Sequence, residues 1–168
     1  MYVIMGKCAF ITVGTTRFDL LIATLFGDEP SALRTLCDCL DVERVIVQTG
    51  LSPMPTTLPS WIAIEHYPYK DSIEDDIRRA DLVISHAGAG TILQTLEAHK
   101  PLLVVVNEHL MNNHQLEIAH QMEQEGYLFH CTCATLTSAL RQFVNHTFKH
   151  YEKGNPALFG RYLNQLMA

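Results

Sequence analysis

The stretch from residue 83 to residue 106, VISHAGAGTILQTLEAHKPLLVVV, contains three candidate elements in a row. An apolar run ends at His86 and a glycine-rich turn follows. Apolar residues then recur at helical spacing before a second apolar run over 102–106. Two apolar strands joined by a helix are typical of a parallel sheet that is buried on both faces. We therefore expect a strand–helix–strand unit, with a glycine turn where its first strand ends.

The same alternation continues in both directions along the chain. Strands are expected at 8–16 (with the loop that closes it), 44–50, 61–67, 81–86, 101–107 and 128–133. Helices are expected at 18–26, 30–41, 70–80, 90–100, 112–127, 135–151 and 155–168. The segment 61–67 alternates apolar and polar residues, which suggests an edge strand. These patterns predict one α/β domain over residues 1–168, with a doubly wound, Rossmann-like parallel sheet.

Composition limits the classes of function. The chain has 168 residues, of which 48% are hydrophobic and 18% are charged, as expected of one globular domain. Its net charge of −6 disfavours nucleic-acid binding through a basic surface. No apolar run approaches the roughly 20 residues of a membrane span. The apolar start at 1–16 lacks a basic segment and a cleavage site, so we interpret it as a first strand and not as a signal peptide.

The cysteines predict neither a disulfide framework nor a metal site. There are five, an odd number, and four of them form two Cys-x-Cys pairs: Cys8, Cys37, Cys39, Cys131 and Cys133. Zinc sites usually have two to four residues between paired cysteines, and these pairs have one. We expect free thiols that pack as small apolar side chains in a reducing compartment.

Two glycine turns are candidates for a phosphate site. In a doubly wound sheet, ligands bind outside the carboxyl ends of the strands, where both Gly14-Thr15-Thr16 and Gly88-Ala89-Gly90-Thr91 are expected. Glycine lets a phosphate approach the backbone, and the N-terminus of the next helix attracts an anion. Neither turn matches Gly-x-Gly-x-x-Gly or a P-loop. A tight turn without a ligand therefore remains an open alternative.

Two polar features accompany these turns. His86 lies at the end of its strand, where it can contact a phosphate or bond to the backbone as a structural group. The segment 107–115, NEHLMNNHQ, is rich in amides and imidazoles, the donors and acceptors that sugar hydroxyls require. A helix cap at Asn112 or Asn113 accounts for one asparagine of this segment but not for the cluster.

These motifs carry a resemblance to a known family. Residues 85–129, SHAGAGTILQTLEAHKPLLVVVNEHLMNNHQLEIAHQMEQEGYLF, together with FITVGTTRFDLLI at 10–22, resemble the catalytic subunit of the eukaryotic two-subunit UDP-N-acetylglucosamine transferase. Such enzymes add the second GlcNAc to dolichol-diphosphate-GlcNAc at the cytosolic face of the endoplasmic reticulum. The resemblance implies the fold of the C-terminal, donor-binding half of a GT-B glycosyltransferase.

The resemblance also implies a set of site residues. The two glycine turns and His86 would flank the nucleotide diphosphate, and the Asn-His-Gln segment would face the donor sugar. His86 and His114 are the candidate catalytic residues. The candidate donor-binding residues are Gly14, Thr15, Thr16, Ser85, Gly88, Ala89, Gly90, Thr91, Gln94, Asn113 and Gln115. Relatives usually have an acidic residue on the ribose where this chain has Gln94, and Glu97 is a candidate substitute one turn further on.

The implied reaction is an inverting transfer from UDP-GlcNAc. The expected holders of the leaving diphosphate are backbone N–H groups of the two turns, with Thr91 and His86. The sequence has no Asp-x-Asp motif, so we expect neither a metal nor a cofactor besides the donor. No general base is evident, and we expect the acceptor site in a second, membrane-anchored subunit without which this chain is inactive.

The last segment, 155–168, is a helix that either packs on the chain's own sheet or docks to that partner, and the resemblance implies docking. It has an apolar stripe at helical spacing: Leu158, Phe159, Tyr162, Leu163 and Leu166. Two rival hypotheses remain. One is a non-catalytic sugar-nucleotide-binding or regulatory subunit, which Gln94 suggests, and the other is a flavodoxin-like phosphate binder.

Overall fold

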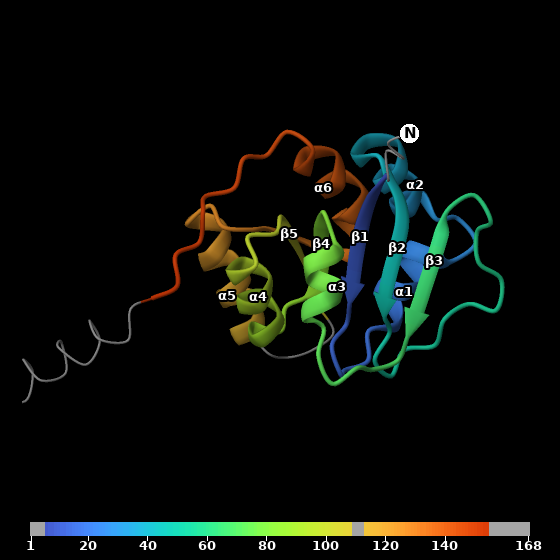
Figure 1. Cartoon of the computed structure of the whole chain (residues 1–168), viewed down its shortest axis with the longest axis horizontal. Helices are drawn as coiled ribbons and strands as arrows, with labels where there is room; N and C mark the ends of the chain where they lie inside the picture. The colour runs from blue at the N-terminus through green and yellow to red at the C-terminus, as the bar shows by residue number, and fades with distance from the viewer. Residues whose placement is uncertain (1–5, 109–112, 155–168) are drawn as a thin grey trace, which may run out of the picture.

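The protein is one parallel sheet with helices on both faces (Figure 1). It is seen in a computed structural model that describes residues 6–108 and 113–154, and of residues 113–115 only the backbone. The strands are β1 (Lys7–Thr12), β2 (Val42–Gln48), β3 (Ala63–Tyr67), β4 (Leu82–His86), β5 (Leu102–Val106) and β6 (Phe129–Thr132). The helices are α1 (Asp19–Phe26), α2 (Ser31–Leu40), α3 (Glu74–Arg79), α4 (Ala89–Glu97), α5 (Asn113–Gln124), the 3₁₀ turn η1 (Cys133–Thr135) and α6 (Leu136–Phe143).

The strand order is β3-β2-β1-β4-β5-β6, and every neighbouring pair is parallel. This is the doubly wound Rossmann order, which confirms the expected fold class. The flavodoxin-like alternative has a different order and is therefore wrong. The direction of winding reverses between β1 and β4, and the switch point lies at the carboxyl ends of these two strands. The expected edge strand is β3, at one margin of the sheet.

Strand alternation builds two apolar layers, one on each face. One layer packs residues such as Ile11 and Val105 against α1, α2 and α6. The other packs residues such as Phe10 and Val104 against α3, α4 and α5. Successive strand residues enter opposite layers because side chains alternate across a strand. The central strands are thus buried on both faces, as their apolar runs predict.

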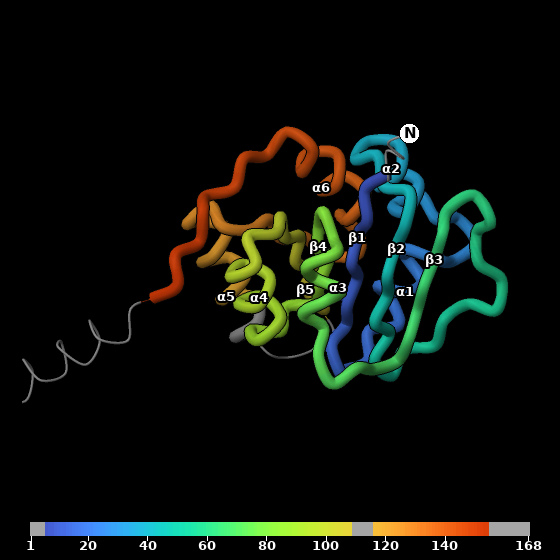
Figure 2. Tube along the Cα trace, viewed as in Figure 1, coloured from blue at the N-terminus to red at the C-terminus, as the bar shows by residue number. Residues whose placement is uncertain are grey.

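The expected helix over 135–151 is wrong in its second half, because α6 ends at Phe143. Beyond it, Phe148 packs against the layer of α6, whereas Tyr151 packs against the opposite layer. We call residues 144–151 the wrapping segment, since it passes from one face of the sheet to the other (Figure 2). A continuous helix cannot place these two side chains on opposite faces. The docking helix expected at 155–168 lies outside the described residues.

All five cysteines are free thiols, as expected. Cys8, Cys131 and Cys133 are buried in the apolar layers. The expectation of burial is wrong for Cys39, which is exposed on α2. Burial raises the pKa of the Cys131 thiol to about 12 and that of Cys133 to about 11. Both buried thiols therefore remain protonated at neutral pH.

Candidate functional site

A pocket of about 340 Å³ opens at the switch point, where the carboxyl ends of β1 and β4 diverge. Three segments enclose it: the loop after β1, the end of β4 with the first turns of α4, and the connection from β3 to α3. Seven of the residues expected from the sequence line it: Gly14, Thr15, His86, Gly88, Gly90, Thr91 and Gln94. The fold thus brings the two glycine turns together, although they are more than 70 residues apart in sequence.

The ring of His86 lies between two of these glycines. A Cβ atom on Gly14 would lie 2.6 Å from its Cε1 atom, and a Cβ atom on Gly88 would lie 2.5 Å from its Nε2 atom. Gly14 also has φ +64, which an L side chain rarely adopts. Both glycines are therefore explained by the histidine and not by a phosphate. At Gly90 an added Cβ atom meets no described atom within 4 Å, so this glycine faces open space among residues 6–108 and 113–154.

The imidazole of His86 is largely buried and has no charged partner in the part of the chain that the structure describes. Burial lowers its pKa, and a backbone contact with Thr12 offsets this only in part. Its Nδ1 atom is buried without a hydrogen-bond partner among the described residues. His86 is consequently neutral at pH 7. It offers a hydrogen bond to a ligand, but no positive charge.

A side chain of β2 holds the loop after β1 in place through hydrogen bonds. Gln48 is 2% exposed, and its Oε1 accepts a 2.6 Å hydrogen bond from the Thr12 hydroxyl. The Thr12 hydroxyl accepts in turn from the Gly14 N–H at 2.9 Å. The Thr16 N–H donates to the Val13 carbonyl at 3.3 Å. The N–H groups of Gly14 and Thr16, which the sequence predicts as donors to a diphosphate, thus already have acceptors within the protein.

Helix α4 supplies the available donors instead. No side chain caps its N-terminus, where Gly88 occupies the N-cap position. Ala89, Gly90 and Thr91 lie in its first turn, in which a helix leaves its N–H groups without an internal partner. Together with the positive end of the helix dipole, these groups form a site for an anion. The N–H of Gly88 is not part of this set, because it donates to the His86 carbonyl at 2.8 Å.

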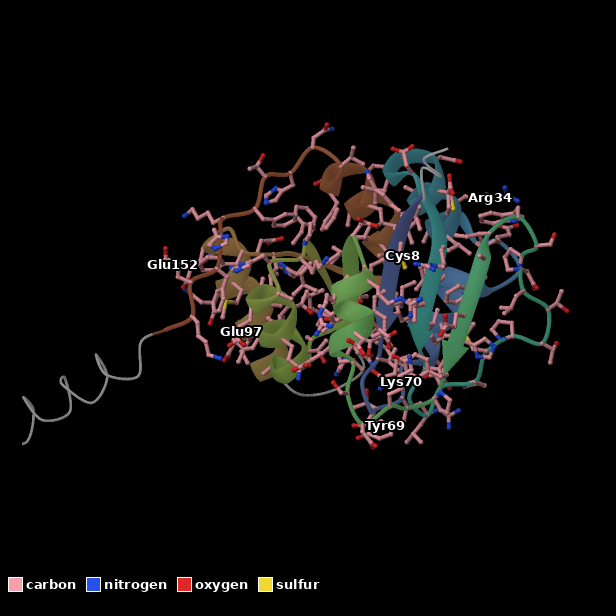
Figure 3. The ribbon with its side chains drawn as sticks, viewed as in Figure 1. Cys8, Arg34, Tyr69, Lys70, Glu97 and Glu152 are labelled. Atoms are coloured by element: carbon pink, nitrogen blue, oxygen red, sulfur yellow. The ribbon has the colours of Figure 1, made fainter. Side chains whose placement is uncertain are left out.

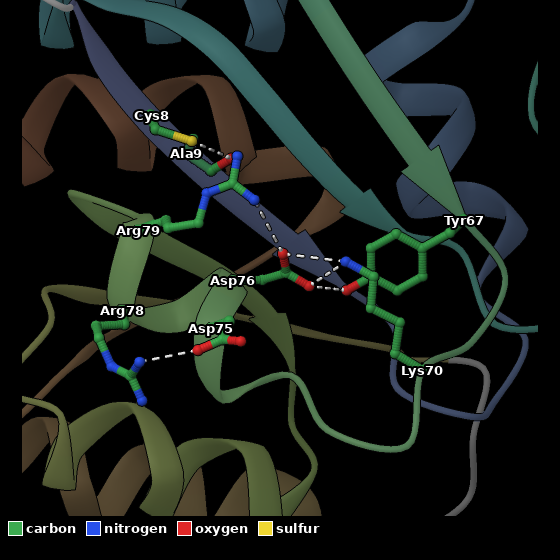
Figure 4. A network of polar contacts seen from close by, with 8 residues as sticks. All are labelled: Cys8, Ala9, Tyr67, Lys70, Asp75, Asp76, Arg78 and Arg79. Carbon is green, nitrogen blue, oxygen red and sulfur yellow. Dashed lines mark hydrogen bonds and ion pairs between the residues drawn. The ribbon is translucent and has the colours of Figure 1, made fainter.

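A lysine that the sequence did not predict lines the pocket, and its ammonium is paired with a carboxylate. Lys70 follows β3, and its Nζ atom lies 2.9 Å from Oδ2 of Asp76, a carboxylate that is 2% exposed (Figure 4). The Tyr67 hydroxyl donates to the same carboxylate, and the Lys70 ammonium lies 3.9 Å from the centre of the Tyr67 ring. Figure 3 shows Tyr69 and Lys70 beside the arrowheads of β2 and β3, at the carboxyl edge of the sheet. Asp76 and Tyr67 therefore position Lys70 at the pocket.

Four further residues of the connection from β3 to α3 also line the pocket: Tyr69, Asp71, Ser72 and Ile73. Gln48 lines it as well, from the end of β2. Gln48 could have been predicted as a pocket residue, because it is a polar residue at the end of a buried strand. No local sequence pattern predicts that the β3–α3 connection lines the pocket, because the position of this connection depends on the order of the strands. It returns from the edge strand across β2 and β1, and so passes over the switch point.

The remaining predicted residues are not among those that line the pocket. Thr16 donates its hydroxyl to the Val13 carbonyl at 2.8 Å. Ser85 is buried and donates to the His86 carbonyl at 2.9 Å, while Ala89 is exposed at the start of α4. Glu97 is not a substitute for an acidic residue at Gln94, because it lies away from the pocket and pairs with Lys153 at 3.1 Å. Asn113, His114 and Gln115 form the first turn of α5, and their side chains lie outside the described part.

The profile of the glycosyltransferase family 28 C-terminal domain matches residues 8–162. The UDP-N-acetylglucosamine transferase subunit ALG13 of Homo sapiens is 53% identical over 134 residues, and that of Mus musculus is 47% identical over 134 residues. Both alignments cover 78% of this chain but 11% of the relative. This chain therefore spans about a tenth of the length of those two relatives.

Two solved structures extend the similarity to the fold. The solution structure of ALG13 has a TM-score of 0.65 at 27% identity, with 94% of each chain covered. The crystal structure of Acinetobacter baumannii MurG has a TM-score of 0.64 at 20% identity, covering 98% of this chain and 43% of that one. At that identity the match to MurG concerns the fold alone. It corresponds to the likeness to one half of a GT-B enzyme that the sequence suggests.

Proposed function

The chain belongs to the family of the glycosyltransferase family 28 C-terminal domain, and from this premise we propose that it is the donor-binding subunit of an inverting UDP-GlcNAc transferase. In this proposal it binds UDP-GlcNAc, and GlcNAc passes to dolichol-diphosphate-GlcNAc. The observation that carries it is the switch-point pocket, which combines an uncapped helix N-terminus with a lysine. The names of the human and mouse relatives support the choice of donor.

The diphosphate of the donor is assigned to the first turn of α4. The N–H groups of Ala89, Gly90 and Thr91 and the Thr91 hydroxyl would donate to its oxygens, and Lys70 would add a charge-assisted contact. The open space beside Gly90 leaves room for a phosphate against the backbone. Gln94, one turn further along α4, is placed to accept from a ribose hydroxyl. The sugar is assigned to Asn113, His114 and Gln115.

The transfer forms one bond and breaks one. The acceptor hydroxyl oxygen attacks the anomeric carbon of GlcNAc, the bond from that carbon to the diphosphate oxygen breaks, and the hydroxyl proton passes to a general base. The groups at α4 stabilise the negative charge that develops on the leaving UDP. Neutral His86 contributes a hydrogen bond to that charge, and we assign the base to the acceptor-binding half.

We further propose that this half is a separate, membrane-anchored subunit at the cytosolic face of the endoplasmic reticulum. The names of the relatives describe a subunit. In the described part of this chain, no helix has the length and hydropathy needed to span a bilayer. Five large apolar side chains are exposed in the segments that follow the carboxyl ends of β1 to β5: Leu20, Leu51, Tyr69, Leu93 and Leu116. We assign them to the contact with the second subunit, with residues 155–168 as the proposed docking helix.

Calorimetric titration with UDP-GlcNAc and with UDP tests the donor site. We expect both to bind, and Gln94→Glu to tighten binding about tenfold, because a carboxylate accepts two hydroxyl hydrogen bonds with charge assistance. Gln142→Glu on the exposed side of α6 is the matched control and should change nothing. If neither the original chain nor the Gln94→Glu variant bound a uridine nucleotide, the donor-site proposal would be overturned.

Gln94 also favours a second candidate function, a regulatory subunit that binds the sugar nucleotide without taking part in the transfer. Activity assays separate the two candidates. The chain alone should show no transfer. The chain with its membrane partner should transfer GlcNAc, and Lys70→Met should lower that rate. A reconstituted complex whose rate is indifferent to Lys70 and to Gly90 substitutions would favour the regulatory function.

A further inference from the structure

A second cluster of polar side chains lies away from the switch point, between α5 and the edge strand β6. His120 and Glu123 are one turn apart on α5, and His130 is the second residue of β6. One nitrogen of each imidazole and one carboxylate oxygen all lie within 4.8 Å of one another. Neither the sequence motifs nor the proposed donor site uses these residues.

The contact between Glu123 and His130 is close and involves both carboxylate oxygens. Oε1 of Glu123 accepts a 2.9 Å hydrogen bond from the backbone N–H of His130. Oε2 lies 2.7 Å from Nδ1 of the same residue. These two contacts hold the carboxylate and the imidazole of His130 side by side, so two candidate ligands of the cluster are already positioned.

His120 completes the cluster from the solvent side. Its side chain is exposed, its ring meets that of His130 edge to face at 5.8 Å, and its Nε2 atom lies 3.0 Å from the Gln124 amide nitrogen. The sequence of α5 contains no Lys or Arg, so the helix itself supplies no cation to Glu123. The chain as a whole has a net charge of −6. The electrostatic setting therefore favours a cation at this place.

We propose that His120, Glu123 and His130 form a binding site for a divalent transition-metal ion, Zn²⁺ by the chemistry of its ligands. Two imidazoles and one carboxylate are a common three-residue set for Zn²⁺, with water as the fourth ligand. Zinc–ligand distances of about 2.0–2.1 Å at tetrahedral angles separate ligand atoms by roughly 3.3 Å. Two adjustments bring the cluster to this value: the exposed His120 rotates toward the other two ligands, and the 2.7 Å contact between Glu123 and His130 opens by about 0.6 Å.

The nearby cysteine is not a fourth ligand. Cys131 follows His130 on β6, but its side chain enters the layer on the opposite face of the sheet. The proposed set is thus made of nitrogen and oxygen ligands, with no thiolate.

A bound ion would join α5 to β6. Helix α5 begins at Asn113, in the segment assigned to the donor sugar, while the ion would bind in its last two turns. The site lies at the margin of the sheet, beyond β5, whereas the pocket lies between β1 and β4. The proposal does not depend on the transferase activity, and we expect the ion to stabilise the fold and not to take part in transfer.

The test is a titration of the full chain with Zn²⁺ in competition with a chromogenic chelator, followed by the visible spectrum of the Co²⁺ form. We expect a single equivalent to bind, and Co²⁺ to give ligand-field bands without thiolate charge transfer. His120→Ala, Glu123→Gln and His130→Ala should each weaken binding at least about tenfold. Because His120 is exposed, His120→Ala should keep the fold, and this variant decides the outcome if the other two unfold.

Two controls address adventitious binding. His66→Ala removes an exposed histidine on β3, and a double variant with Cys37→Ser and Cys39→Ser removes the most accessible thiols. Both should bind Zn²⁺ as the original chain does. The proposal is overturned if the chain binds no Zn²⁺, if binding survives His120→Ala unchanged, or if the double cysteine variant abolishes it.

Discussion

The switch-point pocket and the α5–β6 cluster both contain a histidine at a strand, yet their surroundings are opposite. His86 is enclosed by glycines, forms no ion pair among the described residues and is neutral at pH 7. His130 lies on an edge strand with its ring against the Glu123 carboxylate. The first ring is positioned by the shape of the backbone, and the second by an anion.

The charges that accompany the two rings differ in the same way. The pocket combines the N-terminus of α4 with Lys70, and so is arranged for an anion. The cluster combines a carboxylate with imidazole nitrogens, which suits a cation. What a histidine can do in this fold is therefore set by its neighbours, and three measurements test this contrast.

The largest effect is expected from Gly14→Ala, which disrupts the enclosure of His86. The new methyl group would meet the imidazole at a distance that no real Cβ contact shows, and the residue would keep a left-handed φ. We expect the free energy of unfolding to fall by about 3 kcal/mol. Urea denaturation measures it.

Gly90→Ala is the matched control for that substitution, because its methyl group enters open space. Its stability should stay within about 1 kcal/mol of the original, while UDP binding weakens as the methyl group occupies the place of a phosphate. Equal losses of stability in the two variants would refute the claim that residue 14 must be glycine because the ring of His86 fills the adjacent space.

The next effect concerns the charge of the pocket. Lys70→Met should weaken UDP binding about tenfold, since one charge-assisted contact to the diphosphate is lost. Uridine has no phosphates, so its binding should hardly change. Asp71→Asn, which removes the neighbouring negative charge that also lines the pocket, should tighten UDP binding instead. Calorimetry with UDP and with uridine distinguishes these results, and a parallel loss for both ligands would argue against a phosphate contact of Lys70.

The smallest effect is the pH dependence that His86 confers on stability. Its pKa is lowered in the folded chain, so below the ordinary value of about 6.5 the unfolded chain binds a proton more readily. Stability is therefore lost as pH falls below about 6.5, by up to about 1 kcal/mol between pH 6.5 and 5.5. The slope should shrink in His86→Gln and persist in His66→Gln, whose histidine is exposed. Denaturant titrations at the two pH values give the comparison, and an unchanged slope in His86→Gln would assign it to other groups.

The sequence predicts the fold well because its signals are local. Apolar runs of strand length and helical spacing define the elements, and the carboxyl-end rule brings Gly14 and Thr91 to one pocket. By contrast, the place of Lys70 follows only from the strand order, since its connection crosses two strands to reach α3. The end of α6 at Phe143 was missed for a similar reason, because it depends on which layer receives Phe148 and which receives Tyr151.

The neighbour that requires each of these glycines could not be predicted from the local sequence either. The motif around Gly14 and Gly88 suggests room for a phosphate, but the space is filled by the ring of His86. A sequence shows that a small residue is required without showing which neighbour requires it. Only the fold, which brings residue 14 beside residue 86, identifies that neighbour.

The wrapping segment has a consequence for self-association. An open sheet has two edges, and an uncovered edge can pair with a strand of another molecule. At the β6 side, the wrapping segment packs His146 against Phe129 and bonds Lys149 N–H to the Gly126 carbonyl at 2.9 Å, which shields that edge. At the other side, β3 has five residues and exposes Glu65 and His66, so short length and polarity protect it instead. One edge is thus covered by a segment of the chain, and the other is protected by its short length and polar side chains. We expect aggregation to begin at β3 if Glu65 is replaced by an apolar residue.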